Sequence, residues 1–223
     1  MYTTQTNDSS PISVLDMNVP NVNIFGDTRP TVADIQKRLA CFPWNSLEKP
    51  GKNKGARGQL LEIALGVPNS SALKDLIDGE LKTFTYGESI ACTQLHHCLP
   101  DIVSGSQFEH SKLGKKMEQA VYVAFSKNNE FLGTVTLNKE TYPMHYTELQ
   151  EDYLFICGAV RAAINNKTEI GTTTGPNELL QIRTKASKTN GSYTPLTYNG
   201  HQLKNKGMAF YLCGQFGRKL IPQ

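Results

Sequence analysis

The sequence lacks several features that define whole classes of protein. No apolar run approaches the ~20 residues with which a helix crosses a membrane, so a membrane-spanning protein is not expected. The polar stretch 1–11 shows no basic segment followed by an apolar one, and with no secretory signal visible we expect a cytoplasmic protein. Internal repeats and low-complexity tracts are also missing, which excludes repeat architectures.

Cysteine is scarce and follows neither a disulfide nor a zinc pattern. The five cysteines are odd in number and lie mostly among apolar neighbours, so a disulfide framework is not expected. One short stretch resembles a metal cluster, but no second pair of zinc ligands lies at a matching distance, and we interpret its thiols as buried side chains. That stretch contains Cys92, His96, His97 and Cys98.

Charge of one sign dominates only toward the C-terminal end. Residues 176–223 contain seven Lys or Arg and one acid, Glu178. Since the whole chain carries +3, this stretch is strongly basic and the remainder is slightly acidic. A basic face fits a polyanionic partner such as DNA, because phosphate contacts release condensed counterions. A solvated surface explains the same charges equally well.

The remaining composition is that of a globular domain, with 39% hydrophobic and 19% charged residues over 223 positions. Apolar periodicity predicts helices over 32–42, 56–66 and 148–164. Alternating or continuous apolar runs predict a β-hairpin from 120–125 and 131–137 around the polar turn 126–130, and two last strands at 179–184 and 208–213. Residues 72–86 predict two short strands or one bent strand, broken at Gly79, and residues 1–29 a loosely ordered N-terminal arm.

The run GELK, at 79–82, contains the residues with the clearest chemical potential. Glu80 and Lys82 are two residues apart, so on a strand both side chains leave the same face. Asp75 lies five residues before Glu80 and can fold back across Gly79 to converge with it, although Asp78 is an alternative. Two such carboxylates are hard oxygen ligands suited to Mg²⁺, which keeps several waters and accepts phosphate oxygens.

Glu62 is a third acid, on the predicted helix before this strand. Gly55 and Gly58 precede it at helical spacings of seven and four, so its face is bare enough for close approach by backbone or DNA. A bound Mg²⁺ would polarise a phosphate and lower the pKa of a coordinated water, and Lys82 would orient that water or offset charge. Surface charges on an exposed strand would give the same D-x(4)-E-x-K pattern by chance.

Several blocks, in order, resemble the mismatch-repair nicking endonuclease MutH and its restriction-enzyme relatives, within the PD-(D/E)XK nucleases. The first block is KGARGQLLEIALG, at 54–66, and the second, DLIDGELKT at 75–83, resembles the metal-binding block. The resemblance implies DNA-contacting roles for Lys54 and Gly55, a catalytic-site role for Glu62, metal ligation by Asp75 and Glu80, and a catalytic role for Lys82.

Three further blocks continue the resemblance toward the C-terminal end. In SKLGKKM, a short basic stretch, Lys112 is the matching lysine. The run LQIRTKA resembles the block in which Arg183 and Lys185 would read or grip DNA, and MAFYLCGQF resembles the final strand, with Tyr211 near the target base.

The sequence also departs from the family pattern. The spacing from Asp75 to Glu80 is shorter than in MutH, Thr184 stands in place of the family's proline, and Cys213 and Gly214 replace a basic pair. Base specificity therefore does not transfer from the resemblance.

The fold implied is α+β: a PD-(D/E)XK nuclease core of a mixed central sheet flanked by helices, with two lobes around a DNA cleft. Residues 30–223 would form one nuclease domain, with a catalytic lobe at about 30–140 and a basic DNA-reading lobe at about 141–223.

The function implied is that of a type II restriction enzyme, which hydrolyses both strands of a specific double-stranded DNA site with Mg²⁺ as a monomer or a homodimer. One alternative is a methylation-directed mismatch-repair nickase activated by a partner protein. Another is a DNA-binding module without catalysis. A small-molecule enzyme has no support, because no glycine motif that would cradle a nucleotide is present.

Overall fold

The computed structural model describes residues 27–48, 55–185, 188–189, 192–193, 195–198 and 201–221. Lys54 and all but the last three residues of the predicted N-terminal arm lie outside these ranges. No helix in the described part of the chain is both long enough and apolar enough to cross a membrane.

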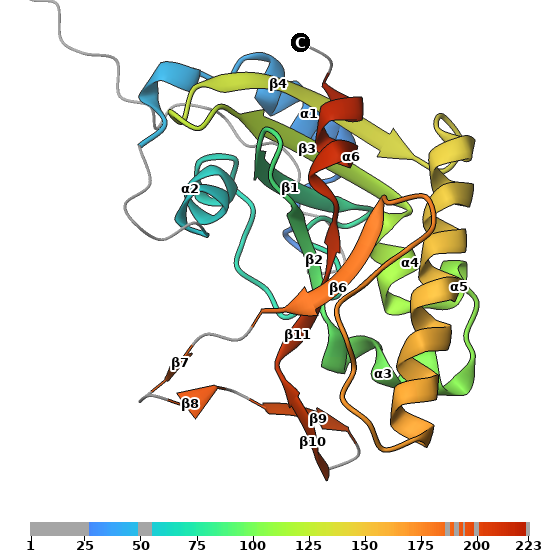
Figure 1. The fold of residues 1–223 in the computed structure, drawn as a ribbon. Coiled ribbons are helices and arrows are strands. Elements are labelled where there is room, and N and C mark those ends of the chain that lie inside the picture. Colours follow the sequence, from blue (N-terminus) through green and yellow to red (C-terminus); the bar gives the residue numbers. More distant parts are fainter. Residues whose placement is uncertain are drawn as a thin grey trace, which may run out of the picture.

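A mixed three-stranded sheet carries the GELK run (Figure 1). Its strands are β1 (Glu80–Thr85), β3 (Gln119–Phe125) and β4 (Phe131–Asn138), in the order β1-β3-β4. The predicted hairpin is confirmed, since β3 and β4 pair antiparallel. β1 runs parallel to β3, and parallel neighbours need a long crossover connection.

The crossover between β1 and β3 contains elements that the sequence did not predict. They are strand β2 (Ile90–Gln94) and helices α3 (Leu95–Ser104) and α4 (Lys112–Met117), with a 3₁₀ turn at Phe108–His110 between the helices. This connection matters for the candidate site because α4 brings a basic segment back toward the start of β1.

A second, antiparallel sheet has the order β2-β11-β6-β5. The predicted last two strands are confirmed as β6 (Leu180–Thr184) and β11 (Met208–Leu212), which pair with each other, and β5 (Thr173–Thr174) forms an edge. The α+β class and a mixed sheet are thus confirmed. A separate antiparallel sheet lies beside it, because β2 pairs with β11.

Short ribbons extend from this second sheet. β7 (Lys188–Thr189) pairs with β8 (Ser192–Tyr193), and β9 (Pro195–Tyr198) pairs with β10 (His201–Lys206). They lie between the two predicted last strands, at 179–184 and 208–213, where the sequence predicted no helix or strand.

The predicted helices are confirmed. Thr31 and Asp34 form a capping box at the start of the first one, which satisfies backbone N–H groups that the helix leaves without partners. The long helix begins five residues earlier than predicted, because Pro143 fits the first helical turn, where no backbone N–H is needed. The remaining bounds are α1 (Val32–Ala40), a 3₁₀ turn (Trp44–Ser46), α2 (Ala56–Ala64), α5 (Pro143–Asn165) and α6 (Gly214–Leu220).

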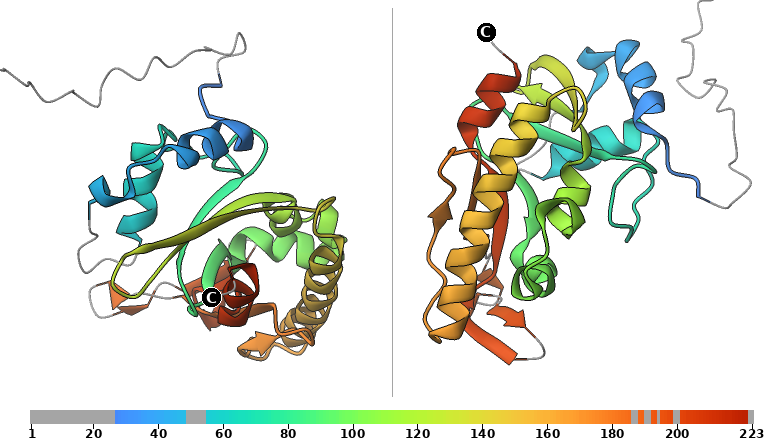
Figure 2. Two further views of the ribbon diagram at one scale, coloured as in Figure 1. Left: turned by 90° about the horizontal axis from the view of Figure 1, so that it is seen from above. Right: turned by 90° about the vertical axis from the view of Figure 1, so that its right-hand side faces the viewer.

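Helices α1 and α2 cover one face of the mixed sheet, and α5 with the second sheet lies on the other (Figure 2). Among the described residues, a hydrophobic core lies on each face. Alternation along β3 sends Val121 and Val123 into the core beneath α1 and α2, and Tyr122 into the core shared with α5 and the second sheet. Lys82 pairs with Tyr122 in register, so Glu80 and Lys82 face the side of the second sheet.

Only one strand forms in residues 72–86, because residues before Glu80 make bends. A Cβ atom at Gly79 would lie 2.5 Å from Val32 Cγ2 and 2.9 Å from the Gln119 carbonyl oxygen, so no larger residue fits without a shift. The prediction of two strands or one bent strand is therefore wrong upstream of Gly79. The break at Gly79 marks the point where an irregular loop enters β1.

Candidate active site

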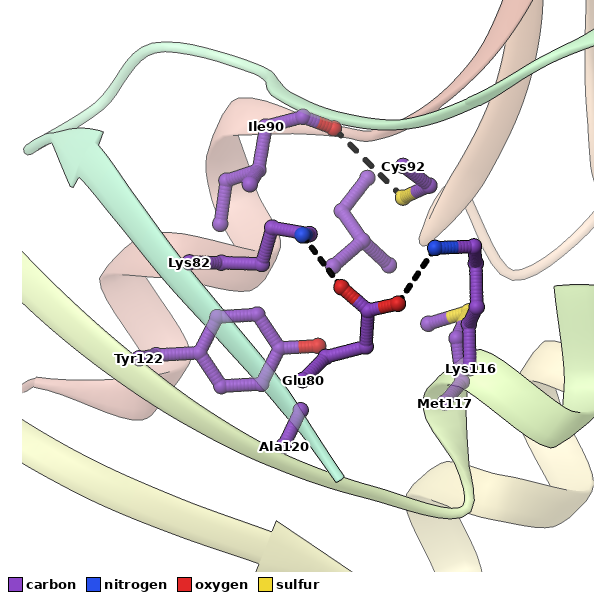
Figure 3. A pocket seen from close by; sticks show the side chains of 9 residues that line it. Glu80, Lys82, Ile90, Cys92, Lys116, Met117, Ala120 and Tyr122 are labelled. Atoms are coloured by element: carbon purple, nitrogen blue, oxygen red, sulfur yellow. Dashed lines mark hydrogen bonds and ion pairs between the residues drawn. The ribbon is translucent and has the colours of Figure 1, made fainter. Parts of the chain in front are cut away.

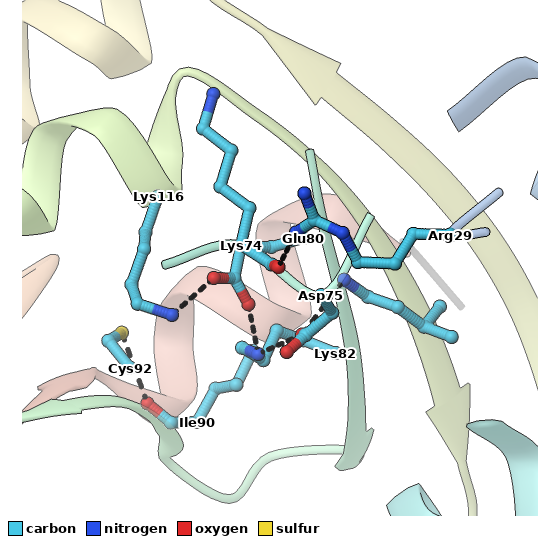
Figure 4. Close-up of polar contacts among 9 residues, drawn as sticks. Arg29, Lys74, Asp75, Glu80, Lys82, Ile90, Cys92 and Lys116 are labelled. Atoms are coloured by element: carbon cyan, nitrogen blue, oxygen red, sulfur yellow. Dashed lines mark hydrogen bonds and ion pairs between the residues drawn. The ribbon is translucent and has the colours of Figure 1, made fainter. Parts of the chain in front are cut away.

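The start of β1 gathers the two acids and the amine that the sequence singled out (Figure 4). Lys82 Nζ forms ion pairs with Glu80 Oε2 on the same strand and, at 2.7 Å, with Asp75 Oδ2 from the preceding loop. The Leu81 backbone N–H also donates to Asp75 Oδ2, at 3.3 Å. Asp75 therefore folds back over the start of the strand, and the structure brings Asp75, Glu80 and Lys82 into one cluster.

Asp78, the alternative to Asp75, has a different role. Its Oδ1 accepts a hydrogen bond from the Val32 backbone N–H at 2.8 Å, and its Oδ2 accepts one from Gln119 Nε2 at 3.5 Å. One oxygen is thus engaged at the start of α1 and the other at the start of β3. The geometry favours Asp75 as the second acid of the cluster.

Lys116 is a member of the cluster that sequence reasoning missed. Its Nζ contacts Glu80 Oε1 from α4, so Glu80 lies between two ammonium groups (Figure 3). Lys112, the predicted lysine of the same block, is exposed, and its backbone N–H donates to Asp101 Oδ2 at 2.8 Å. Nothing in SKLGKKM marks which of its lysines faces the sheet, because this depends on how α4 is oriented.

Burial sets the electrostatics of the acid pair, since Glu80 is only 1% exposed. Burial and a hydrogen bond with Asp75 raise the pKa of Glu80 to about 7, although the charges of Lys82 and Lys116 act in the opposite direction. Burial would raise the pKa of Asp75 as well, but the hydrogen bond with Glu80 and the charge of Lys82 lower it to about 2. The two carboxyl groups thus share one proton near neutral pH.

The two carboxyl groups stabilise the positive charge of Lys82. Burial would lower the pKa of its ammonium group, but the charges of Glu80 and Asp75 raise it. Lys82 is therefore a cation throughout the physiological range. Its position between the two carboxylates is one that suits a cation.

A pH-dependent stability follows from the raised pKa of Glu80 in the metal-free protein. Between pH 4.5 and 7 the unfolded chain loses the Glu80 proton while the folded chain keeps it, so stability falls as pH rises. Wild type should therefore lose about 1–3 kcal/mol relative to Glu80→Gln between pH 5 and pH 8. Urea unfolding of both proteins in EDTA measures this difference, and parallel pH profiles would contradict it.

Glu62 lies near the cluster without joining it. It is half-buried on α2, where burial and the charge of Asp75 raise its pKa and the charge of Lys82 lowers it. Within the described ranges, no group of three or more His, Cys, Asp or Glu lies close enough to hold a metal ion. The cluster therefore offers two protein carboxylates, and the role of Glu62 stays a prediction.

Gly58, on the helix face that the sequence predicted to be bare, has a role in packing. A Cβ atom there would lie 3.3 Å from Thr83 Oγ1, so the glycine allows α2 to approach β1 closely. Gly55, by contrast, is exposed at the start of α2. Of the two glycines, Gly55 is the one placed where a large ligand can approach.

Predicted DNA-contacting residues lie together on the second sheet. The exposed Arg183 guanidinium, on β6, lies 4.3 Å from the centre of the Tyr211 ring on β11. Tyr211 is half-buried, and Lys185 is exposed just beyond β6, its backbone N–H donating to the Gly207 carbonyl at 2.8 Å. Tyr211 is thus partly surface rather than plain core, and the structure brings these three residues onto adjacent chain segments.

The second sheet borders the acid cluster. A small pocket beside Glu80 and Lys82 is lined by Ile90 and Cys92 of β2 and by Leu212 of β11 (Figure 3). Cys92, half-buried, and Cys98, buried, have thiol pKa values raised to about 12 by burial, which agrees with their interpretation as packed side chains. This apolar lining contributes to the burial that raises the pKa of Glu80.

The donor set fits Mg²⁺. Two carboxylates converge where a cationic group already lies between them, and Mg²⁺ is typically bound by one or two carboxylates, with waters and substrate phosphate oxygens as the other ligands. Asp75 and Glu80 are the residues that would hold it. Burial raises the pKa of the neighbouring Cys92 thiol to about 12, which disfavours a thiolate ligand beside these oxygens.

Comparison of the sequence with models of known protein families gives no match. Comparison with curated proteins gives none either.

Proposed function

We propose that this protein is a Mg²⁺-dependent, sequence-specific endonuclease of double-stranded DNA, of the restriction type and similar to the MutH-like PD-(D/E)XK nucleases. The observation that supports the proposal is the convergence of Asp75, Glu80 and Lys82 at the start of β1. Two acids and an amine in this arrangement are suited to the hydrolysis of a phosphodiester.

When bound, Mg²⁺ would polarise the scissile phosphate and lower the pKa of the attacking water. Asp75 and Glu80 are the residues that would hold it, with both carboxyl groups ionised. Lys82, next to both carboxylates, offsets negative charge as it develops on the phosphate. Lys116, on the other oxygen of Glu80, places a second ammonium group within reach of the same phosphate.

DNA recognition is assigned to the second sheet. Contact with the Tyr211 ring restricts the Arg183 guanidinium while the residue remains exposed, and a preorganised guanidinium can bind the edge of guanine through two hydrogen bonds. Lys185 and the other basic residues of the C-terminal part would contact phosphates.

Arg183→Ala should weaken binding to the cognate site by about 1–3 kcal/mol and relax specificity at one base position. Binding to a panel of single-base variants of the site measures both effects. Lys185→Ala is the matched comparison, because loss of a phosphate contact lowers affinity uniformly across sequences. An equal loss on all sequences for Arg183→Ala would assign it to the DNA backbone instead.

Digestion of a mapped, unmodified DNA by the purified chain with Mg²⁺, followed by sequencing of the ends, tests the proposed function. Cleavage of both strands at one short sequence, abolished by EDTA, is the expected result. Nicking only after a partner protein is added would favour the mismatch-repair alternative. Specific binding without any cleavage would identify a DNA-binding module and overturn the proposal.

A further inference from the structure

The loop that carries Asp75 is held by the segment that enters α1. Arg29 donates from its NH1 group to the Lys74 carbonyl at 2.7 Å (Figure 4), and the Ile77 backbone N–H donates to the Pro30 carbonyl at 3.1 Å. Asp78 then accepts from the Val32 backbone N–H at 2.8 Å. These contacts fall on both sides of Asp75, from a segment more than 40 residues away in sequence.

Arg29 is itself held in one orientation. Its Nε donates to Asp27 Oδ1 at 3.0 Å and its NH2 group to Asp27 Oδ2 at 2.6 Å, an arrangement in which the planar guanidinium matches both carboxylate oxygens. The Arg29 side chain is 17% exposed. With its remaining NH1 group directed at the Lys74 carbonyl, Arg29 fixes the peptide immediately before Asp75.

Besides these contacts, the Lys74 ammonium forms an ion pair with Glu118 Oε2 at 3.2 Å, and Gln119 Nε2 donates to Asp78 Oδ2 at 3.5 Å. Residues 72–79 belong to no helix or strand, and the backbone bond from Leu76 to the Gly79 carbonyl, at 2.9 Å, closes only a local turn. Leu76 is fully buried in the core beneath α1, which anchors the loop but does not orient its neighbour. The Asp75 carboxylate must nevertheless reach both Lys82 and the Leu81 N–H.

We propose that Arg29 is a positioning residue for Asp75: by holding the Lys74 carbonyl, it keeps the Asp75 carboxylate where it meets Glu80 and the divalent ion. This inference rests on the proposed function. Arg29 contacts neither the reacting atoms nor the ion, so its effect must pass through the placement of Asp75. Residues that orient a metal ligand in this way typically change metal affinity by about 10–100-fold when they are replaced.

The test compares Arg29→Ala with Arg38→Ala. Arg38, on α1, makes an equivalent contact from its guanidinium to the Leu65 carbonyl, away from Asp75, and so controls for the loss of an arginine–carbonyl bond. We expect Arg29→Ala to raise the Mg²⁺ concentration for half-maximal cleavage by about 10–100-fold. Calorimetric titration with Mg²⁺ in the absence of DNA should show the same loss, and Arg38→Ala should change neither value.

Hydrogen exchange supplies a readout that needs no activity. Amides of residues 75–78 should exchange faster in Arg29→Ala than in wild type, while amides of β3 stay protected. Arg29→Lys keeps the positive charge but lacks the planar guanidinium, so its amides at 75–78 should exchange at rates between those of wild type and Arg29→Ala. This variant replaces Arg29→Ala in the test if the alanine variant fails to fold.

Unchanged Mg²⁺ dependence and unchanged exchange in a folded Arg29 variant would overturn this inference, with the proposed function intact. Faster exchange without any Mg²⁺ binding or cleavage by wild type would instead overturn the proposed function. In that case Arg29 would order a loop with another purpose.

Discussion

Lys82→Ala should lower the rate of Mg²⁺-dependent DNA cleavage by about 10²–10³-fold while the protein stays folded. Lys82 is the group whose ammonium contacts both Asp75 and Glu80. Under the proposed function, its charge would offset the negative charge that develops on the phosphate. Mg²⁺ binding should persist, because the ion replaces the positive charge that the carboxylates lose. Single-turnover cleavage at saturating Mg²⁺, together with calorimetric titration of the ion, separates the two effects.

Lys37→Ala is the control for this experiment. It removes the same charge from an exposed position on α1, a helix that packs on the opposite face of the mixed sheet. We expect cleavage by this variant at the wild-type rate. If Lys82→Ala also cut at the wild-type rate, the cluster at the start of β1 could not be the catalytic centre.

Asp152→Ala should lower the free energy of unfolding by about 3–5 kcal/mol. Asp152 is fully buried on α5, and its carboxylate accepts from the backbone N–H groups of Asn177 at 2.7 Å and of Leu179 and Leu180 at 2.8 Å each. Alanine would leave these amides buried without a partner. Because they lead into β6, which carries Arg183, DNA affinity should fall as well.

Urea unfolding measures the stability difference. Asp152→Asn, which keeps one acceptor oxygen, should give an intermediate loss, and Glu140→Ala, which removes a charge from an exposed turn, should stay within about 0.5 kcal/mol of wild type. A loss below about 1 kcal/mol for Asp152→Ala would mean that water replaces the carboxylate.

The elements that could be predicted are those whose signal is local. Helix α1 repeats apolar residues on one face and begins at a capping box, and the β3–β4 hairpin has apolar runs around a polar turn. Helix α3 gives a weaker signal because Pro100 lies inside it, and α4 is too short, at six residues, to show a period. Both belong to the crossover that the sequence did not predict.

The residues of the candidate site also differ in whether local sequence patterns could predict them. The pairing of Glu80 with Lys82 follows from strand alternation alone. The choice of Asp75 over Asp78 could not be made from the sequence, because it depends on bonds from Arg29 and Val32, which are distant along the chain. Lys116 likewise depends on the path of the crossover. Long-range packing therefore decides the members of the cluster that spacing leaves open.

For the basic C-terminal stretch, too, the sequence alone could not predict which residues lie together. Charge counting located it, but only the pairing of β6 with β11 places the Arg183 guanidinium on the Tyr211 ring. The half-buried Tyr211 ring thus lies next to the exposed Arg183 at the surface of the second sheet.

The central claim is that Asp75 and Glu80 hold one divalent ion. Crystals of the protein soaked in Mn²⁺ test it directly, because the anomalous signal of Mn²⁺ locates the ion without reference to activity. We predict a peak within about 2.5 Å of a carboxylate oxygen of Asp75 and of Glu80, with the Lys82 ammonium displaced from between them. Bound Mn²⁺ elsewhere, with Lys82 still paired to both acids, would contradict the claim.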